Sequence, residues 1–215
     1  MSEVKTVSPA FIATCSYLGW GDPEGGIWLI GLEEESTWDG YSTEQIIDEC
    51  RGFGAFRRDP ECQPSSTWKT GRQVRDCAAK ILHAVSRDQQ ITWRDYRDKR
   101  LYVDGYKACQ SNLFPLGKPT WNGWPETYSS MFGFSNTDVG RDTYRAAVRE
   151  YRWPVFRREW DANKPQATIC FGKVGWPYVR EIFSLKNEGE ALADGRFRCT
   201  RVSESFSRHS SDEAI

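Results

Sequence analysis

The sequence predicts an α/β fold: one three-layer α/β/α domain over residues 1–215, with a central, mostly parallel sheet. Short apolar runs bounded by turn residues alternate with segments of helical spacing, and this alternation is typical of a parallel sheet covered by helices on both faces. The chain has 39% hydrophobic and 27% charged residues, which is ordinary for a globular protein. A chain of 215 residues is long enough for one sizeable core.

Four segments are expected to form the strands. Residues 27–32, Ile-Trp-Leu-Ile-Gly-Leu, form a continuous apolar run after the glycine-rich turn at 21–26, as in a buried parallel strand. The next strand is expected at 106–113, before the proline-containing loop 114–119. The remaining strands are expected at 167–170 and 196–203.

Helices are expected between these strands. Ser42 and Gln45 form a capping-box pattern that predicts a helix beginning within 42–50. Apolar residues recur at helical spacing in 71–85. Further helices are expected at 141–160, with a kink or break near Pro154, and at 176–185, whereas 121–136 is expected to be a long surface loop.

The composition excludes several classes of protein. No apolar run approaches the roughly 18 residues of a transmembrane helix, and the N-terminus lacks the features of a signal peptide, so we expect a cytoplasmic protein without a membrane partner. The seven cysteines are odd in number and form no Cys-x-x-Cys pair. We therefore expect reduced thiols, with no structural metal, no iron–sulfur cluster and no cofactor.

The charge is unevenly distributed. Residues 1–50 carry ten acidic and one basic residue, whereas residues 51–215 carry 20 acidic and 28 basic residues. Arg outnumbers Lys by 20 to 9, which favours a phosphate-rich partner. Arg141, Arg145 and Arg149 share one helix face; they either contact phosphate or form a solvated face with nearby acids. The residues expected to contact a nucleic-acid backbone are Lys118, Lys173, Arg145 and Arg149.

Three polar segments follow predicted strands: 31–35, 111–115 and 203–209. Ligands of open α/β sheets bind at the carboxyl ends of the strands, so an active site is expected there. Among Glu33, Glu34 and Glu35, one carboxylate either activates water or lies near a helix N-terminus. Asn112 either pairs with a base edge or opens an Asx turn. His209 either donates to a leaving group or is a solvated tail residue.

The ordered segments GLEEES, SNLFPLGKP, FGKVGW and SFSRHS, between residues 17 and 212, resemble the motifs of the uracil-DNA glycosylase superfamily. Gly31-Leu32-Glu33 corresponds to the family's first motif, and Asn112 to its strand-end Asn. The tail corresponds to the His-Pro-Ser loop but has no Pro, so Ser205, Arg208 or His209 takes the place of the family His. Glu replaces the usual Asp, the Asp-Pro-Tyr form is missing, and the family's iron–sulfur cysteines are absent. These differences argue against ordinary uracil as the substrate.

The resemblance implies a monofunctional DNA glycosylase that flips a base out of DNA and hydrolyses its N-glycosidic bond. Separately, the chain is expected to be a monomer. Glu33, or alternatively Glu34, would assist the attacking water, and His209 or Arg208 would stabilise the departing base. No lysine nucleophile is expected. The remaining substrate-binding candidates are Gly31, Leu32, Asn112, Trp38, Tyr41, Phe53 and Ser205.

The substrate is open between two classes of base. Some relatives in this superfamily are associated with anti-phage defence and remove hypermodified bases, such as glucosylated hydroxymethylcytosine, from phage DNA. The alternative is repair of uracil or another deaminated base. Two other functions remain possible from the residues alone: a metal-dependent nuclease with Glu33–Glu35 as ligands, and a non-catalytic, arginine-rich nucleic-acid-binding module.

Overall fold

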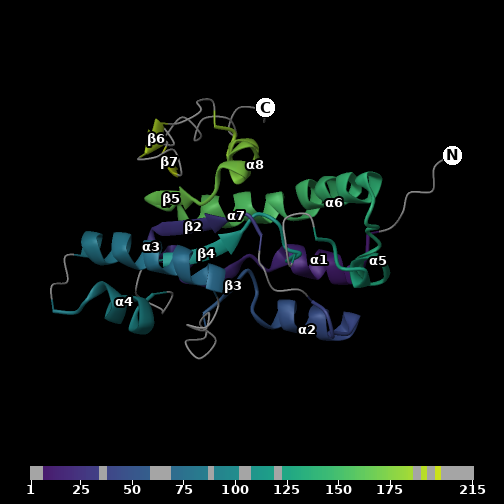
Figure 1. Cartoon of the computed structure of the whole chain (residues 1–215), viewed down its shortest axis with the longest axis horizontal. Coiled ribbons are helices and arrows are strands. Elements are labelled where there is room, and N and C mark those ends of the chain that lie inside the picture. Colours follow the sequence, from purple (N-terminus) through teal and green to yellow (C-terminus); the bar gives the residue numbers. More distant parts are fainter. Residues whose placement is uncertain are drawn as a thin grey trace, which may run out of the picture.

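The computed structural model describes residues 7–33, 38–58, 69–86, 90–101, 108–118, 123–185, 190–192 and 197–199 (Figure 1). Four of the predicted site residues lie outside these ranges: Glu34, Ser205, Arg208 and His209. Of Lys173 only the backbone is described. Among the described helices, none is both long and apolar enough to cross a bilayer.

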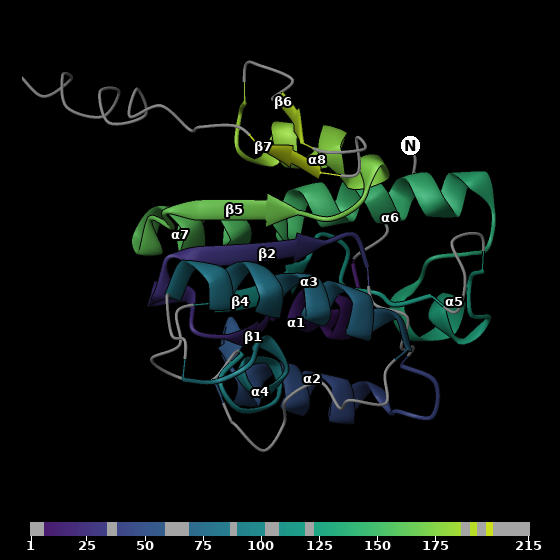
Figure 2. The same cartoon turned by 60° about the vertical axis from the view of Figure 1, so that its left-hand side comes forward.

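A five-stranded, mostly parallel sheet forms the centre of the molecule, in the order β3-β1-β4-β2-β5. Strand β2 runs parallel to both β4 and β5, and β1 is parallel to β3 but antiparallel to β4. Figure 2 shows β2 and β5 side by side with the same direction. The strands are β1 (Gly19–Gly21), β2 (Ile27–Gly31), β3 (Phe56–Arg57), β4 (Ala108–Asn112) and β5 (Ala167–Cys170).

Helices cover both faces of the sheet. Along β2, Trp28 and Ile30 are buried in a core with α1, α6 and α7, whereas Leu29 is buried on the opposite face against α3 and α4. Burial on both faces explains why this strand is apolar throughout. The helices are α1 (Pro9–Ser16), α2 (Thr43–Gly52), α3 (Lys69–Ser86), α4 (Trp93–Lys99), α5 (Thr127–Phe132), α6 (Asp138–Tyr151), α7 (Trp153–Asn163) and α8 (Trp176–Ile182).

Two local predictions are confirmed in detail. The capping box of α2 is complete: the backbone N–H of Gln45 donates to Ser42 Oγ (3.2 Å), and the backbone N–H of Ser42 donates to Gln45 Oε1 (2.7 Å). The predicted helix over 141–160 is interrupted at Arg152, between α6 and α7. Pro154 lies in the first turn of α7, where its missing N–H costs no helical hydrogen bond.

Two predictions about secondary structure are wrong. Residues 121–136 are not a continuous loop, because 127–132 form α5, whose Tyr128 and Phe132 are buried one turn apart. The segment is too short for a helical period to stand out among its Gly, Ser and Asn residues. The last predicted strand, 196–203, does not extend the central sheet: its described residues form β7 (Phe197–Cys199), which pairs with β6 (Glu190–Leu192) in a separate antiparallel hairpin.

Candidate functional site

The carboxyl ends of β2 and β4 lie side by side, as the sequence predicts. Gly31 pairs in register with Asn112. Beyond the strands, Leu113 N donates to Gly31 O (3.0 Å) and Phe114 N donates to Leu32 O (2.9 Å). This extended pairing brings Glu33, two residues after β2, beside the loop that follows β4.

Gly31 is required by a close approach of the two strand ends. A Cβ atom at this position would clash with the side-chain oxygen of Asn112. Asn112 is buried, with only 8% of its surface exposed, and its amide lies against the Gly31 backbone. The predicted proximity of Gly31 and Asn112 is therefore confirmed, although neither residue lines the pocket described next.

Two tyrosine hydroxyl groups anchor the loop after β4. The N–H of Leu116 donates to the buried Tyr144 hydroxyl (3.3 Å), and the Tyr128 hydroxyl donates to Gly117 O (2.5 Å). Tyr144 belongs to α6 and Tyr128 to α5, so the loop is attached to two helices. Lys118 follows directly and is therefore held at a defined place above the end of β2.

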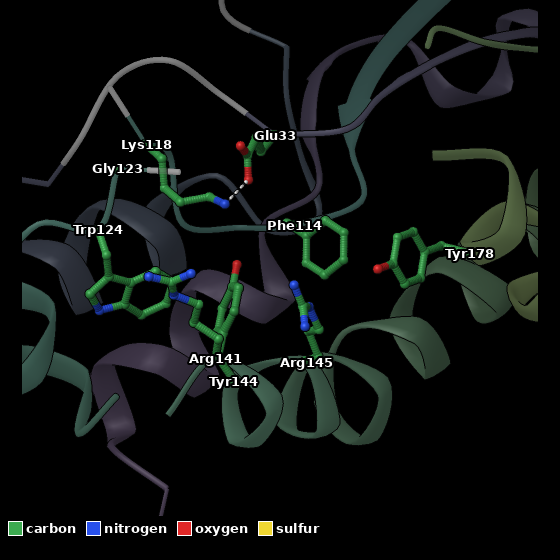
Figure 3. A pocket seen from close by; sticks show the side chains of 9 residues that line it. All are labelled: Glu33, Phe114, Lys118, Gly123, Trp124, Arg141, Tyr144, Arg145 and Tyr178. Carbon is green, nitrogen blue, oxygen red and sulfur yellow. Dashed lines mark ion pairs between the residues drawn. The ribbon is translucent and has the colours of Figure 1, made fainter. Parts of the chain in front are cut away.

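A small pocket opens at this edge of the sheet (Figure 3). Its cavity volume is about 60 Å³, well below the ~300 Å³ at which drug-sized ligand pockets begin. Lys118 reaches across the opening to Glu33, and Arg145 extends from α6 towards Phe114 (Figure 3). The lining consists of Glu33, Phe114, Lys118, Gly123, Trp124, Arg141, Tyr144, Arg145 and Tyr178.

Glu33 and Lys118 form an ion pair that is largely removed from solvent. Glu33 Oε2 lies 3.0 Å from Lys118 Nζ, and the two side chains are only 12% and 14% exposed. Burial raises the pKa of the Glu33 carboxyl above its ordinary value, while the charge and hydrogen bond of Lys118 act in the opposite direction. Partly buried carboxyl groups with perturbed pKa values are typical of functional sites.

Positive charge dominates the pocket wall. Arg141 and Arg145 lie one turn apart on α6 and face Lys118 across the pocket, so three cationic side chains accompany the Glu33 carboxylate in the described lining. The two guanidinium groups have local partners: Arg141 donates to Asn136 Oδ1 (2.9 Å) and Arg145 to Asp142 Oδ1 (2.9 Å). This arrangement is suited to binding an anion.

Aromatic rings complete the wall. Phe114 and Tyr178 meet edge to face with centroids 5.0 Å apart, and Trp124 makes a similar contact with Tyr144 at 5.2 Å. The indole N–H of Trp124 donates to Phe134 O (2.9 Å), which fixes the ring. Phe114, Trp124 and Tyr144 are buried, whereas the Tyr178 ring is partly exposed. An exposed ring beside cationic groups is a combination that nucleic-acid-binding sites use for stacking and phosphate contacts.

The basic stretch after Arg141 is not one uniform surface. Arg149 pairs with Glu181 (3.1 Å) and lies over the Trp153 ring, outside the pocket lining. Arg152 follows three residues later, but it is 2% exposed and therefore not a surface phosphate ligand. It donates to the backbone carbonyl groups of Thr14, Cys15, Tyr17, Leu18, Asn112 and Leu113.

The predicted aromatic residues Trp38, Tyr41 and Phe53 do not line the pocket. The ring centroids of Trp38 and Tyr41 are 5.2 Å apart, and Arg57 Cζ lies 3.9 Å from the centroid of the Phe53 ring. Leu32 packs against the core. Phe114 lies within the segment 111–115 at which an active site is expected, whereas Tyr144 and Tyr178, which also line the pocket, are not among the predicted residues. Tyr144 lies between Arg141 and Arg145 in the sequence, which was a usable signal; Tyr178 offered none.

Within the described ranges, no three His, Cys, Asp or Glu side chains gather into a group that could hold a metal ion. Glu34 and Glu35 lie outside those ranges. Neither the scan against protein-family models nor the searches of curated proteins and of solved structures found a match to this chain. Its function is therefore inferred from the chemistry of the pocket.

Proposed function

We propose that the chain is a monofunctional DNA glycosylase with a uracil-DNA glycosylase-like fold, and that Glu33 is its catalytic carboxylate. The observation that supports this most strongly is the partly buried Glu33 at the carboxyl end of β2, in a pocket that also contains three cationic side chains and an aromatic wall. A carboxylate beside the sugar, cations for the phosphate groups and rings for stacking are the groups that such a reaction requires.

The proposed reaction breaks the bond between C1′ of the deoxyribose and the base nitrogen. The bonding electron pair leaves with the base, and positive charge develops on the sugar. The Glu33 carboxylate stabilises that charge and accepts a proton from the attacking water, whose oxygen forms the new bond to C1′. The base takes up a proton, and an abasic site remains. In this proposal Arg208 or His209 stabilises the departing base, and Glu34 is the alternative carboxylate.

The proposed substrate is a modified base in DNA. The pocket is small, so in this proposal the base itself lies outside it, next to the partly exposed Tyr178 ring. A hypermodified phage base such as glucosylated hydroxymethylcytosine, removed in anti-phage defence, is the first candidate. Uracil or another deaminated base is the second.

One observation favours a non-catalytic alternative. Glu33 is already paired with Lys118 at 3.0 Å, and a carboxylate neutralised by an ammonium group is a weaker base than a free one. A nucleic-acid-binding module would use the same cations and rings, bind DNA in a salt-dependent manner and leave it intact.

The test is a mass-spectrometric screen for released bases in the presence of EDTA. The substrates are unmodified DNA, uracil-containing DNA and glucosylated phage DNA. Glu33→Gln is compared with Glu24→Gln, whose carboxylate is exposed and paired with Arg58 outside the pocket. We expect base release by the wild type and by Glu24→Gln, and a loss of at least ~100-fold in Glu33→Gln. Equal activity of the two variants would exclude Glu33 as the catalytic group. Binding without release of any base would support the non-catalytic module.

A further inference from the structure

The pocket contains more positive charge than its own carboxylate neutralises. Lys118, Arg141 and Arg145 line it together with Glu33, and its volume of about 60 Å³ suits one compact anion better than a ring system. Guanidinium groups present planar pairs of N–H donors that match the oxygens of a phosphate group. The chemistry of the pocket therefore points to a phosphate ligand.

We propose that Lys118, Arg141 and Arg145 form a phosphate-binding site, and that a phosphate group entering this site displaces Glu33 from Lys118. The proposal rests on the proposed function in one respect: the phosphate belongs to the nucleic acid whose base is removed. Binding of the nucleic acid then frees the Glu33 carboxylate to act on water.

The present partners of the two arginine residues are easily exchanged. Arg145 pairs with Asp142 only three residues away on the same helix, and their side chains are 43% and 74% exposed. Arg141 binds the nearby Asn136 side chain at an exposed position. Exposed pairs of this kind contribute little free energy, so an incoming phosphate group replaces them at small cost.

The frame behind the three cations is rigid. Tyr144, between Arg141 and Arg145, is buried and accepts a hydrogen bond from Leu116 N. The helix that carries both arginine residues is thus attached directly to the loop that carries Lys118. A backbone frame fixed in this way lowers the ordering cost of binding an anion.

Glu33 and the phosphate group compete for the same ammonium group. Glu33 Oε2 lies 3.0 Å from Lys118 Nζ, where a phosphate oxygen would also bind. A phosphate group beside Lys118 repels the neighbouring carboxylate, which reduces the pairing between Glu33 and Lys118. Removing the Glu33 charge should therefore strengthen phosphate binding, the opposite of what a substrate-binding carboxylate would do.

The experiment measures affinity by fluorescence anisotropy in EDTA at constant ionic strength. The probe is a short single-stranded oligonucleotide labelled at its 3′ end, with either a 5′-phosphate or a 5′-hydroxyl group. Arg145→Gln is compared with Arg158→Gln, whose guanidinium group is exposed, paired with Glu159 and outside the pocket. Glu33→Gln is compared with Glu24→Gln. Inorganic phosphate is the competitor, with potassium chloride of equal ionic strength as its control.

We expect Arg145→Gln to weaken binding by about tenfold, which corresponds to one charge-assisted contact, and Arg158→Gln to change it by less than about twofold. Glu33→Gln should tighten binding by about three- to tenfold, and Glu24→Gln should not. Inorganic phosphate should compete better than chloride with the wild type but not with Arg145→Gln. Equal effects of Arg145→Gln and Arg158→Gln, or weaker binding by Glu33→Gln, would overturn the proposal.

The two probes distinguish the source of the phosphate group. A preference for the 5′-phosphorylated probe that disappears in Arg145→Gln assigns the site to a terminal phosphate. Equal binding of both probes, still dependent on Arg145, assigns it to the phosphodiester backbone. Thermal unfolding followed by circular dichroism verifies that each variant folds. Arg141→Gln, one helical turn before Arg145, is a second variant that should weaken binding in the same way.

Different results would reject the proposed phosphate site and the proposed glycosylase reaction. Base release together with binding that does not depend on Arg145 would reject the phosphate site alone. Binding that depends on Arg145, without release of any base, would reject the proposed reaction and leave the phosphate site.

Discussion

Arg145 and Arg152 lie only seven residues apart, but the protein uses them in opposite ways. Arg152 is 2% exposed and donates to backbone carbonyl groups of α1, of the segment before β1 and of the β4 end, at distances from 2.6 to 3.4 Å. Arg145 lines the pocket, and its side chain is 43% exposed and paired with Asp142. The same residue type therefore serves packing at one position and remains available to a ligand at the other.

The difference lies in the partners rather than in the charge. Backbone carbonyl groups that are fixed in the fold cannot leave, so Arg152 is a permanent connection between the N-terminal helix and the strand end at Asn112. Side-chain partners such as Asp142 can rotate into water, so Arg145 can exchange them for an anion. A cationic side chain that is available to a ligand can therefore be distinguished by its mobile side-chain partners.

The largest effect is expected for Arg152→Met, which leaves several buried carbonyl groups without a donor. We expect the free energy of unfolding to fall by about 3 to 5 kcal/mol in urea denaturation. Arg145→Met, at an exposed pair, should change it by less than about 1 kcal/mol. Similar losses for the two variants would remove the distinction between them.

A smaller loss is expected for Tyr144→Phe, which removes the acceptor for Leu116 N. An unsatisfied buried N–H costs about 1 to 3 kcal/mol, and the variant should lose free energy of unfolding in that range. Tyr178→Phe is the control, because Tyr178 is only partly buried and faces the pocket (Figure 3). If Tyr144→Phe unfolds at the same urea concentration as the wild type, the loop is not held by this hydroxyl group.

The pH dependence of base release tests the electrostatics of the pocket. Burial raises the pKa of Glu33 and Lys118 lowers it. The reaction needs the ionised carboxyl, so kcat/KM should fall as the pH falls through this raised pKa. Lys118→Met removes the interaction that lowers the pKa of Glu33, so the fall of kcat/KM at acidic pH should move to higher pH. If the fall of kcat/KM stays at the same pH or moves to lower pH in this variant, Lys118 does not lower the pKa of Glu33.

The same pKa shift has a consequence for stability. A carboxyl group whose pKa is higher in the folded than in the unfolded protein stabilises the fold fully below its unfolded pKa. That contribution is lost as the pH rises through the folded pKa. Replacing Glu33 by Gln should therefore leave the free energy of unfolding at neutral pH unchanged or slightly higher. A marked loss would show that the ion pair is a structural element.

The smallest effect is expected for Arg149→Gln. The sequence places Arg149 on the same helix face as Arg145, but its guanidinium group is paired with Glu181 and lies over Trp153. We expect DNA affinity to change by less than about twofold, compared with about tenfold for Arg145→Gln. An equal loss in both variants would extend the nucleic-acid surface along α6 beyond the pocket.

Most of the fold follows from local sequence signals. The apolar run at 27–32 and the Ser42–Gln45 capping box each correspond to a single local structure, and both occur. The short elements β1, β3, α1, α4 and α5 were not predicted, because segments of two to eight residues acquire their conformation from neighbouring strands and helices rather than from their own periodicity. The antiparallel β6–β7 hairpin likewise depends on pairing that the sequence does not specify.

Site residues that directly follow strands in the sequence were predictable, whereas those brought to the pocket by tertiary packing were not. Glu33 and Lys118 follow adjacent parallel strands, and the rule that ligands bind at strand ends identified that edge. Trp38, Tyr41 and Phe53 follow the same strand in the sequence but lie outside the pocket. Tyr178 reaches the pocket from α8, 64 residues beyond Phe114 along the chain, through a contact visible only in three dimensions.

The most direct test of the central claim is a single-turnover measurement of base release from glucosylated phage DNA, with DNA binding measured in the same samples. The proposal predicts that Glu33→Gln binds at least as tightly as the wild type but releases base at least ~100-fold more slowly, while Glu24→Gln matches the wild type in both. Undiminished base release by Glu33→Gln would contradict the assignment of Glu33 as the catalytic carboxylate.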